Sequence, residues 1–434
     1  MAALKLTIAG DLAPIRAFAP VIERNPESIY GDLLPRLRQA DYRIVNLESP
    51  LAGTDFIVKS GAAFTGKPEH LGVLTCVPFE AVTLANNHTF DTGTEGYRQT
   101  CSLLDRAGIA RTGSGTLAEA QKPLIIQKNG IRIAVFNFSE GEDMRGASES
   151  VPGVAPWDPE TVCRNIREAK KSGRYQAVIV IVHCGLEYYP FPPMYVYQTF
   201  EKLAEAGADL IAGHHVHVPQ GMTRFGSVPA YFSLGNFVFF QDNQLLHRKT
   251  GYLLEVEIGE NGIDHAEPQP YRIGADGVRL LTAPEKMEFD TLFRRISEPL
   301  KTSENAKRAW EACLAWYGLK GYCAELEKIL DTMRDSPRKG AAMLRNRVQC
   351  IRCCMHRTRL RSMAAPLRGV LRIVSRIFSS SAQYPLSPYQ ARHASQARFA
   401  FFDVFSGSEI RSNRVSNSFF SSGVSIRTPS APIR

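Results

Sequence analysis

The sequence has no apolar segment long enough to cross a lipid bilayer. Its longest buried-looking run, Ala177–Val182, has the length of one strand, whereas a membrane-spanning helix needs about 20 apolar residues. The N-terminus reads MAALKLTIAGD, without the basic segment and long apolar stretch of a secretory signal peptide. We therefore expect no transmembrane segment and a cytoplasmic location.

The sequence also lacks a convincing set of cysteines for disulfides or for structural zinc. Its nine cysteines are an odd number spread over 434 residues, and with no export signal this distribution favours reduced thiols. The motif CxxCCxH at Cys350–His356 offers four candidate ligands for a zinc ion. A zinc site usually combines two separated ligand pairs, and no second pair follows, so free thiols are the preferred interpretation.

Excess positive charge is missing from most of the chain. The net charge is +9, from 52 Lys and Arg against 43 Asp and Glu. Residues 336–434 contain 17 basic and 2 acidic residues, which leaves 35 basic and 41 acidic residues in residues 1–335. A basic tail can bind nucleic acid or anionic lipid, but this one contains no recognised binding module. Nucleic acid is therefore not an expected partner.

Composition and hydrophobic patterning predict a globular α/β domain. Hydrophobic residues make up 44% of the chain and charged residues 22%, values that exclude wholesale disorder and fibrous rods. Short apolar runs recur through residues 1–265, and such runs are typical of strands covered on both faces by helices. The runs are Leu4–Ala9, Arg43–Leu47, Ala81–Ala85, Ile131–Phe138, Ala177–Val182, Asp209–Ala212 and Ala230–Leu234. Residues 95–107 and 195–206 have helical spacing and end beside Gly108 and Gly207, as helix C-caps often do.

The rest of the chain is predicted to form an appendage and a tail. The run YLLEVEIGENGID predicts a closing hairpin with Asn261 and Gly262 at its turn. We predict one α/β domain over residues 1–265, a connecting segment and helical appendage over residues 266–378, and a disordered Arg- and Ser-rich tail over residues 379–434.

Polar clusters follow five of the predicted strands. Ligands of open α/β sheets bind beyond the carboxyl ends of the strands, so the clusters are expected to meet at one edge. They are Gly10-Asp11, Asn46-Leu47-Glu48, Asn86-Asn87-His88, His183 and His214-His215-Val216-His217. Each cluster alone is also typical of a turn or strand end, although an extended backbone would place His215 and His217 on one face. Together they offer the carboxylate and imidazole ligands that suit Mn, Fe or Zn.

Two divalent ions at such an edge need a shared anionic ligand. Cations about 4 Å apart repel each other unless an anion lies between them, and Glu48 can supply that carboxylate. A pair of ions activates a water and holds a phosphoryl oxygen for in-line attack. The inventory therefore predicts a site that binds two divalent metal ions and acts on a phosphoester.

Six segments of residues 4–240 occur in the order typical of a known family. They are AGD (9–11), NLESPL (46–51), LANNHTFDTGTEG (84–96), HCGLEYYPFPP (183–193), GADLIAGHHVHVPQG (207–221) and YFSLGNFVF (231–239). Together they resemble the CapA family of bacterial poly-γ-glutamate capsule synthesis, which is similar to the calcineurin-like metallophosphoesterases. The resemblance implies a sandwich of two β-sheets flanked by helices. It also implies a link to capsule or cell-envelope polymer synthesis, with capsule-synthesis proteins as partners.

The resemblance further implies a role for each residue at the strand ends. Glu48 resembles the carboxylate that bridges the two metals. The residues that resemble the other ligands are Asp11 and His217 for the first metal, and Asn87, His183 and His215 for the second. His88 resembles the histidine that protonates the leaving oxygen, and Asp91 would orient His88 and raise its pKa.

The sequence departs from the wider superfamily at the first metal. The usual motif is Asp-x-His, but here it reads Asp11-Leu12-Ala13, so one imidazole ligand is missing. Glu48 also stands where an aspartate is usual, which adds a methylene group. The expected consequences are weaker binding of the first metal and altered spacing between the two ions.

Two further segments lie close to these motifs. The segment GLEYYPFPP (185–193) is stiffened by three prolines; it is either a wall that contacts substrate, through Glu187 and Tyr188, or a packed crossover. Asn236 is expected to support the same edge. The main functional hypothesis is metal-dependent phosphoester hydrolysis, and the alternative is a non-catalytic accessory subunit of a polyglutamate synthase that binds a polyanionic substrate.

Overall fold

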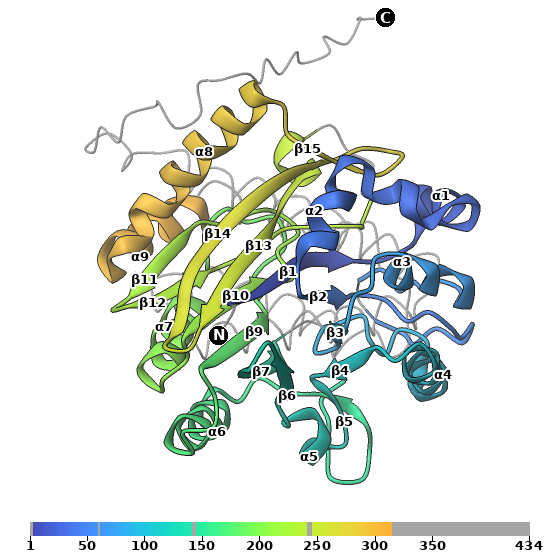
Figure 1. Cartoon of the computed structure of the whole chain (residues 1–434), viewed down its shortest axis with the longest axis horizontal. Helices are drawn as coiled ribbons and strands as arrows, with labels where there is room; N and C mark the ends of the chain where they lie inside the picture. The colour runs from blue at the N-terminus through green and yellow to red at the C-terminus, as the bar shows by residue number, and fades with distance from the viewer. Residues whose placement is uncertain (1–2, 60, 141–144, 241–244, 315–434) are drawn as a thin grey trace, which may run out of the picture. The chain divides into compact units, whose positions relative to one another are not determined.

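The computed structural model describes residues 3–59, 61–140, 145–240 and 245–314, which form two large β-sheets with helices around them (Figure 1). In spatial order the first sheet comprises β15 (Val278–Leu280), β14 (Gly262–Ile273), β13 (Thr250–Gly259), β1 (Leu4–Leu12), β2 (Tyr42–Leu47), β3 (Ala81–Thr83) and β4 (Ala110–Thr112). The second comprises β11 (Met222–Phe225), β12 (Val228–Tyr231), β10 (Leu210–His214), β9 (Ala177–His183), β7 (Ile131–Ser139) and β6 (Leu124–Lys128). A separate small sheet pairs β5 (Ser114–Gly115) with β8 (Gly153–Val154).

Helices connect the strands and flank the two sheets. The α-helices are α1 (Ala19–Arg24), α2 (Leu34–Gln39), α3 (Gly72–Thr75), α4 (Gly93–Arg106), α5 (Leu117–Ala120), α6 (Pro159–Lys171), α7 (Met194–Glu205), α8 (Ala283–Ser297) and α9 (Ser303–Cys313). The short 3-10 helices are η1 (Arg16–Phe18), η2 (Pro26–Leu33), η3 (Pro68–Leu71), η4 (Leu246–Lys249) and η5 (Glu298–Lys301). The predicted α/β sandwich of two sheets flanked by helices is confirmed.

Strand β9 shows how the sheets and helices share their apolar side chains. All seven residues of β9 are buried. Ala177, Ile179 and Ile181 pack with side chains of the first sheet, and Val178, Val180 and Val182 pack with side chains of α6 and α7. Burying one such isoleucine or valine contributes about 1.5–3 kcal/mol relative to leaving it exposed. The continuous apolar run therefore reflects a strand covered on both faces, as predicted.

The strand directions bring the predicted polar clusters to one edge. β1, β2 and β3 run parallel to one another, and so do β9 and β10. Backbone bonds join β1 to the segment that follows β12 there, because N–H of Asp11 donates to the carbonyl of Gly235 (3.1 Å) and N–H of Phe237 donates to the carbonyl of Asp11 (2.8 Å). A Cβ at Gly10 would lie 2.1 Å from that Gly235 oxygen. Glycine at position 10 is therefore required by the close approach of the two backbones.

The predicted helices and hairpin are present with small shifts. Helices α4 and α7 correspond to the segments with helical spacing, and Gly108 (φ 69°) and Gly207 (φ 107°) follow them in the left-handed conformation of a C-cap. The hairpin joins β13 to β14 with Gly259 paired to Gly262, so residues 260–261 form the turn. The turn lies one residue before the predicted one because Gly262, with φ 120°, already belongs to β14.

The described residues after 265 contain both strands and helices. They include α8 and α9, and the first sheet continues beyond residue 265 through β14 to β15. The domain boundaries at 265 and 378 stay a prediction. Residues 315–434, with most of the predicted appendage, the basic tail and the motif Cys350–His356, lie outside the described residues. Among the helices that the structure describes, none has both the length and the apolar character to cross a membrane.

Candidate metal centre

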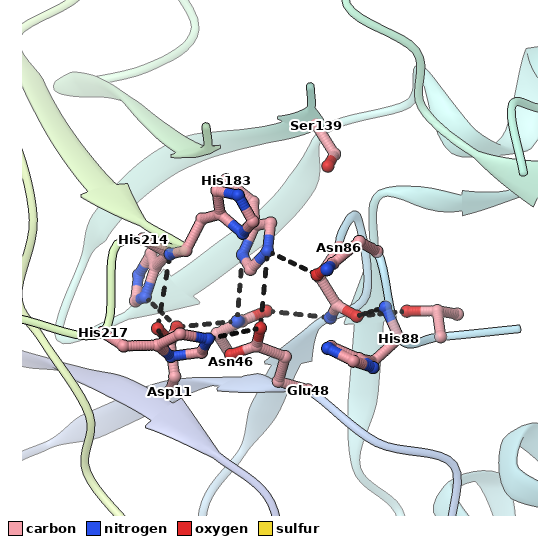
Figure 2. A network of polar contacts seen from close by, with 12 residues as sticks. Asp11, Asn46, Glu48, Asn86, His88, Ser139, His183, His214 and His217 are labelled. Carbon is pink, nitrogen blue, oxygen red and sulfur yellow. Dashed lines mark hydrogen bonds and ion pairs between the residues drawn. The ribbon is translucent and has the colours of Figure 1, made fainter. Parts of the chain in front are cut away.

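The ends of five strands converge on one buried cluster of acidic, amide and imidazole groups (Figure 2). Two groups of three side chains each bring one ligand atom per residue within 4.8 Å of the others. One group is Glu48, His183 and His215, and the other is Asp11, Glu48 and His217. Every member is buried, and Glu48 belongs to both groups. The geometry therefore provides two adjacent candidate cation sites that share one carboxylate.

Glu48 lies between imidazoles of the two groups. Its Oε1 is 3.6 Å from Nε2 of His183 and 3.8 Å from Nε2 of His217. Both carboxylate oxygens are buried and have no hydrogen-bond partner among the described residues. Burial, together with the charges of Asp11 and Glu187, raises the pKa of Glu48 well above its usual value. A buried carboxylate without donors is costly, and cations on either side would offset that cost.

The imidazoles of His183 and His215 have the protonation state that metal ligation requires. Burial, followed by the charges of neighbouring histidines, lowers the pKa of His183 well below its usual value. Burial also lowers the pKa of His215 to about 4, and its buried Nδ1 has no hydrogen-bond partner among the described residues. Neutral imidazoles are ligands for divalent metals. The donor set and its unsatisfied atoms therefore fit metal ions.

Asn87 joins the group that contains His183. Its Oδ1 lies 3.0 Å from Nε2 of His183. An amide oxygen and an imidazole nitrogen are both ligands of divalent ions, so Asn87 and His183 would be able to hold one ion together. The structure thus brings together all six predicted metal ligands, and their individual roles remain a proposal.

Asp11 is held by two residues that the sequence interpretation did not single out. Nδ2 of Asn46 donates to Oδ1 of Asp11 (2.8 Å), and Nδ1 of His214 lies 2.9 Å from the same oxygen. Burial raises the pKa of Asp11, but the hydrogen bond and charge of His214, with contributions from His217 and Asn46, outweigh it and lower the pKa. Asp11 is therefore kept ionised. Asn46 and His214 both belong to the polar clusters at strand ends, and that position in the sequence could have indicated their role.

His217 is oriented by Asn236. Nδ1 of His217 lies 2.7 Å from Oδ1 of Asn236, and because an amide oxygen only accepts, Nδ1 donates. The lone pair is then on Nε2, the nitrogen that faces Glu48. A hydrogen bond of this kind fixes the tautomer of a metal-binding histidine.

His88 and Asp91 form a buried pair beside the candidate cation sites. Nδ1 of His88 donates to Oδ2 of Asp91 (2.7 Å). Lys59, a residue absent from the sequence predictions, lies 2.7 Å from Oδ1 of Asp91. Asp91 acts to raise the pKa of His88 as expected, but burial and then the charge of Lys59 outweigh it, so the pKa is lowered. The ring of Phe64 stacks on His88 with the centroids 4.0 Å apart.

The position of the missing Asp-x-His imidazole is apolar. Ala13 is fully buried in a small cluster with Ile15 and Phe239, and Phe64 packs against it. Phe239 also contacts the ring of His217 (5.1 Å). The candidate first-metal group therefore has Asp11, Glu48 and His217 as its charged and imidazole ligands.

The segment with Glu187 and Tyr188 borders the cluster. N–H of Tyr188 donates to the carbonyl of Val216 (2.8 Å), and its ring lies 5.8 Å from that of His217. The charge of Glu187 affects the pKa of Glu48, His88 and His215.

Backbone strain is concentrated at this border. Five non-glycine residues in the described part of the chain have positive φ, and three of them are Tyr188 (68°), His215 (89°) and His217 (61°). Such strain costs of order 1–3 kcal/mol per residue and clusters at functional sites. The segment is thus packed against the histidines, and contact of Glu187 and Tyr188 with substrate stays a prediction.

Comparison with known proteins shows the family of this chain. The model of the family described as bacterial capsule synthesis protein PGA_cap matches residues 5–241. The PGA biosynthesis protein CapA of Bacillus subtilis (strain 168) is 30% identical over 308 residues, covering 67% of this chain and 79% of the relative. The capsule biosynthesis protein CapA of Bacillus anthracis is 26% identical over 304 residues, covering 68% and 73%. The solved structure of a 5'-nucleotidase precursor from Thermus thermophilus is 14% identical, with a TM-score of 0.40 and coverage of 72% of this chain and 58% of that one. The predicted resemblance to CapA is confirmed, and the chain belongs to the bacterial capsule synthesis family PGA_cap.

Proposed function

We propose that this protein is a metal-dependent phosphoester hydrolase that acts in the synthesis of a polyglutamate capsule or a related cell-envelope polymer. The observation that carries the proposal is the pair of three-residue ligand groups sharing Glu48. Two divalent ions held there would supply Lewis-acid activation of a water and of a phosphoryl oxygen. Asp11 and His217 would hold one ion, Asn87, His183 and His215 the other, and Glu48 both.

The proposed acid is His88. Its Nδ1 donates to Asp91, so the ring is fixed and Nε2 is left to transfer a proton to the leaving oxygen. Burial and Lys59 lower the pKa of His88 in the ligand-free protein. The negative charge of a bound phosphoester would raise that pKa again, because a nearby anion favours the imidazolium form.

A second candidate is a non-catalytic accessory subunit that binds a polyanionic substrate for a polyglutamate synthase. It is favoured by the names of the two CapA relatives, which describe biosynthesis. In this alternative the metal centre contributes binding and stability, with other capsule-synthesis proteins as partners.

Hydrolysis of an aryl phosphate ester with added Mn²⁺ separates the two candidates. The protein is expected to turn over the ester, and His88→Ala is expected to lose at least a hundredfold in kcat with its metal content unchanged. The matched control is His70→Ala, because His70 is a buried histidine that contacts Glu23 instead of the cluster. A metal-loaded, folded protein without turnover with any divalent ion would support the accessory role.

A further inference from the structure

Three helices near the end of the described chain pack beside the segment that carries two of the proposed metal ligands. These C-terminal helices are α8, η5 and α9 (residues 283–313), and they lie beyond the part of the chain that the family model matches, residues 5–241. α8 and η5 contact β11, and α9 contacts α7 (Figure 1). Oη of Tyr197 on α7 donates to the carbonyl of Leu300 in η5 (3.2 Å). The neighbouring segment, the histidine loop, comprises residues 215–221 and connects β10 to β11.

The first contact lies at the C-terminal end of the histidine loop. A Cβ at Gly221 would lie 2.6 Å from the carbonyl oxygen of Ile296 and 2.7 Å from Cα of Ser297. N–H of Met222 donates to Oγ of Ser297 (3.0 Å). The backbone at the end of α8 therefore lies so close to the loop that a side chain at position 221 would push the two apart.

The second contact joins α9 to the segment that borders the metal centre. The buried ring of Trp310 lies 5.6 Å from the ring of Tyr189. The carbonyl of Tyr189 accepts from Nε2 of Gln220 (2.8 Å), and N–H of Tyr188 donates to the carbonyl of Val216 (2.8 Å). Trp310 therefore supports a segment that is bonded to the histidine loop at two points.

The histidine loop needs support because its backbone is strained. His215 and His217 have positive φ values of 89° and 61° and lie on either side of Val216. Non-glycine residues keep such conformations only where the surrounding structure over-determines them. The bond from Tyr188 holds the loop between the two histidines, so its loss would let both imidazoles turn away from the candidate cation sites.

We infer that the C-terminal helices brace the histidine loop, and that Trp310 is a positioning residue for the proposed metal ligands His215 and His217. The inference rests on the proposed function, because the ions concerned are those of the proposed hydrolase. It makes the affinity of the centre for divalent ions depend on residues outside the part of the chain that the family model matches.

Competition between the full-length protein and a fluorescent chelator for Mn²⁺ tests this inference. Trp310→Ala is expected to weaken binding about tenfold, the lower end of the usual effect of removing a group that orients metal ligands. Trp310→Phe retains an aromatic ring against Tyr189 and is expected to bind within about threefold of the wild-type protein.

Tyr189→Leu tests the same contact from its other side. Tyr189 is only half-buried, so this variant decides the question even where Trp310→Ala does not fold. Its loss of Mn²⁺ affinity is expected to equal that of Trp310→Ala. Because both substitutions remove one contact, the double variant is expected to bind no more weakly than either single variant.

Hydrogen exchange of the metal-free protein, followed by mass spectrometry, gives a second readout. The amide of Tyr188 is bonded to Val216 in the wild-type protein. It is expected to exchange faster in Trp310→Ala and in Tyr189→Leu, because the segment that carries it is no longer held by α9.

Phe289→Ala on α8 is the matched control. Phe289 is also a buried aromatic residue of the C-terminal helices, and among the described residues its ring contacts Tyr252 and Phe293, which are not part of the histidine loop. Both Ala variants lose a large buried ring, so both are expected to be destabilised. Only Trp310→Ala is expected to lose Mn²⁺ affinity and protection of the Tyr188 amide.

Four results would overturn the inference. They are wild-type affinity for Mn²⁺ in Trp310→Ala and Tyr189→Leu, an equal loss in Phe289→Ala, additive losses in the double variant, and unchanged exchange of the Tyr188 amide. None of these measurements involves turnover. Weakened Mn²⁺ binding in a protein that hydrolyses no ester would retain the inference and reject the hydrolase, whereas ester hydrolysis with wild-type affinity in the variants would do the reverse.

Discussion

The ammonium of Lys59 lies 2.7 Å from Oδ1 of Asp91, and the two side chains are only 3% and 0% exposed. The same ammonium is 3.0 Å from the carbonyl of Asn87 and 3.2 Å from Nδ1 of His88. Oδ2 of Asp91 accepts from His88 and from N–H of Phe64. The buried ion pair between Lys59 and Asp91 thus connects a loop to the carboxylate that orients His88, the proposed acid.

Lys59→Met is expected to lower the free energy of unfolding by about 3 kcal/mol, because it leaves the charge of Asp91 buried without a cation. Urea unfolding followed by tryptophan fluorescence measures the change. The control is Lys286→Met, since Lys286 pairs with Asp290 on the surface, with 49% and 45% of the side chains exposed, and exposed pairs contribute about 0–1 kcal/mol. Equal losses of unfolding free energy in the two variants would mean that the buried ion pair stabilises the protein no more than the exposed pair does.

The predicted strands and the polar residues at their ends could be derived from sequence because both follow from local patterns. A continuous apolar run such as Ala177–Val182 indicates a strand covered on both faces, and parallel strands place their carboxyl ends together. Asp11, Glu48 and His183 therefore meet although they are far apart in the chain.

The residues that sequence reasoning missed act through contacts between distant segments. Lys59 lies in an irregular loop, and its partner Asp91 follows 32 positions later. Asn46 was noted as part of a polar cluster, but its bonds to Asp11 and His183 depend on how the two sheets meet. The pKa of His88 is lowered mainly by burial. How deeply a side chain is buried cannot be predicted from a local sequence pattern, so the direction of this shift could not be predicted either.

Glu48→Gln is expected to remove both metal ions and yet stabilise the metal-free protein. The raised pKa of Glu48 means that the folded protein holds a proton that the unfolded chain releases above about pH 4.5. The wild-type protein in EDTA therefore loses stability as the pH rises from that value towards the folded-state pKa. Glutamine avoids this loss, so thermal unfolding at pH 7 is expected at a higher temperature in the variant, with the difference disappearing below pH 4.5.

The matched control for this substitution is Glu257→Gln on β13, where the side chain is exposed. Elemental analysis is expected to find wild-type metal content in the control and none in Glu48→Gln. A Glu48→Gln protein that retains both ions would exclude Glu48 as the shared ligand.

Between about pH 4.5 and the raised pKa of Glu48, binding of Mn²⁺ is expected to release about one proton. Ligands must be deprotonated to bind a metal, and Glu48 is the group that holds a proton in this pH range, because its pKa is raised. His183 and His215 release none, because burial keeps both neutral in this pH range. Calorimetry in buffers of different ionisation enthalpy gives the proton count. A count of zero, or of two or more, would contradict this assignment of protonation states.

Asn46→Ala is expected to weaken Mn²⁺ binding about 10- to 100-fold, the usual effect of removing a group that orients metal ligands. Asn46 donates to Asp11 and lies 3.3 Å from Nδ1 of His183, so its loss frees a side chain from each candidate site. The control is Asn137→Ala on β7. Asn137 is also buried and, among the described residues, bonds only to backbone, accepting from N–H of Ala85 and donating to the carbonyl of Ile181. Both variants are expected to lose about 1–3 kcal/mol of stability. Only Asn46→Ala is expected to lose affinity in a competition assay with a fluorescent chelator, and the same loss in both variants would assign the effect to stability alone.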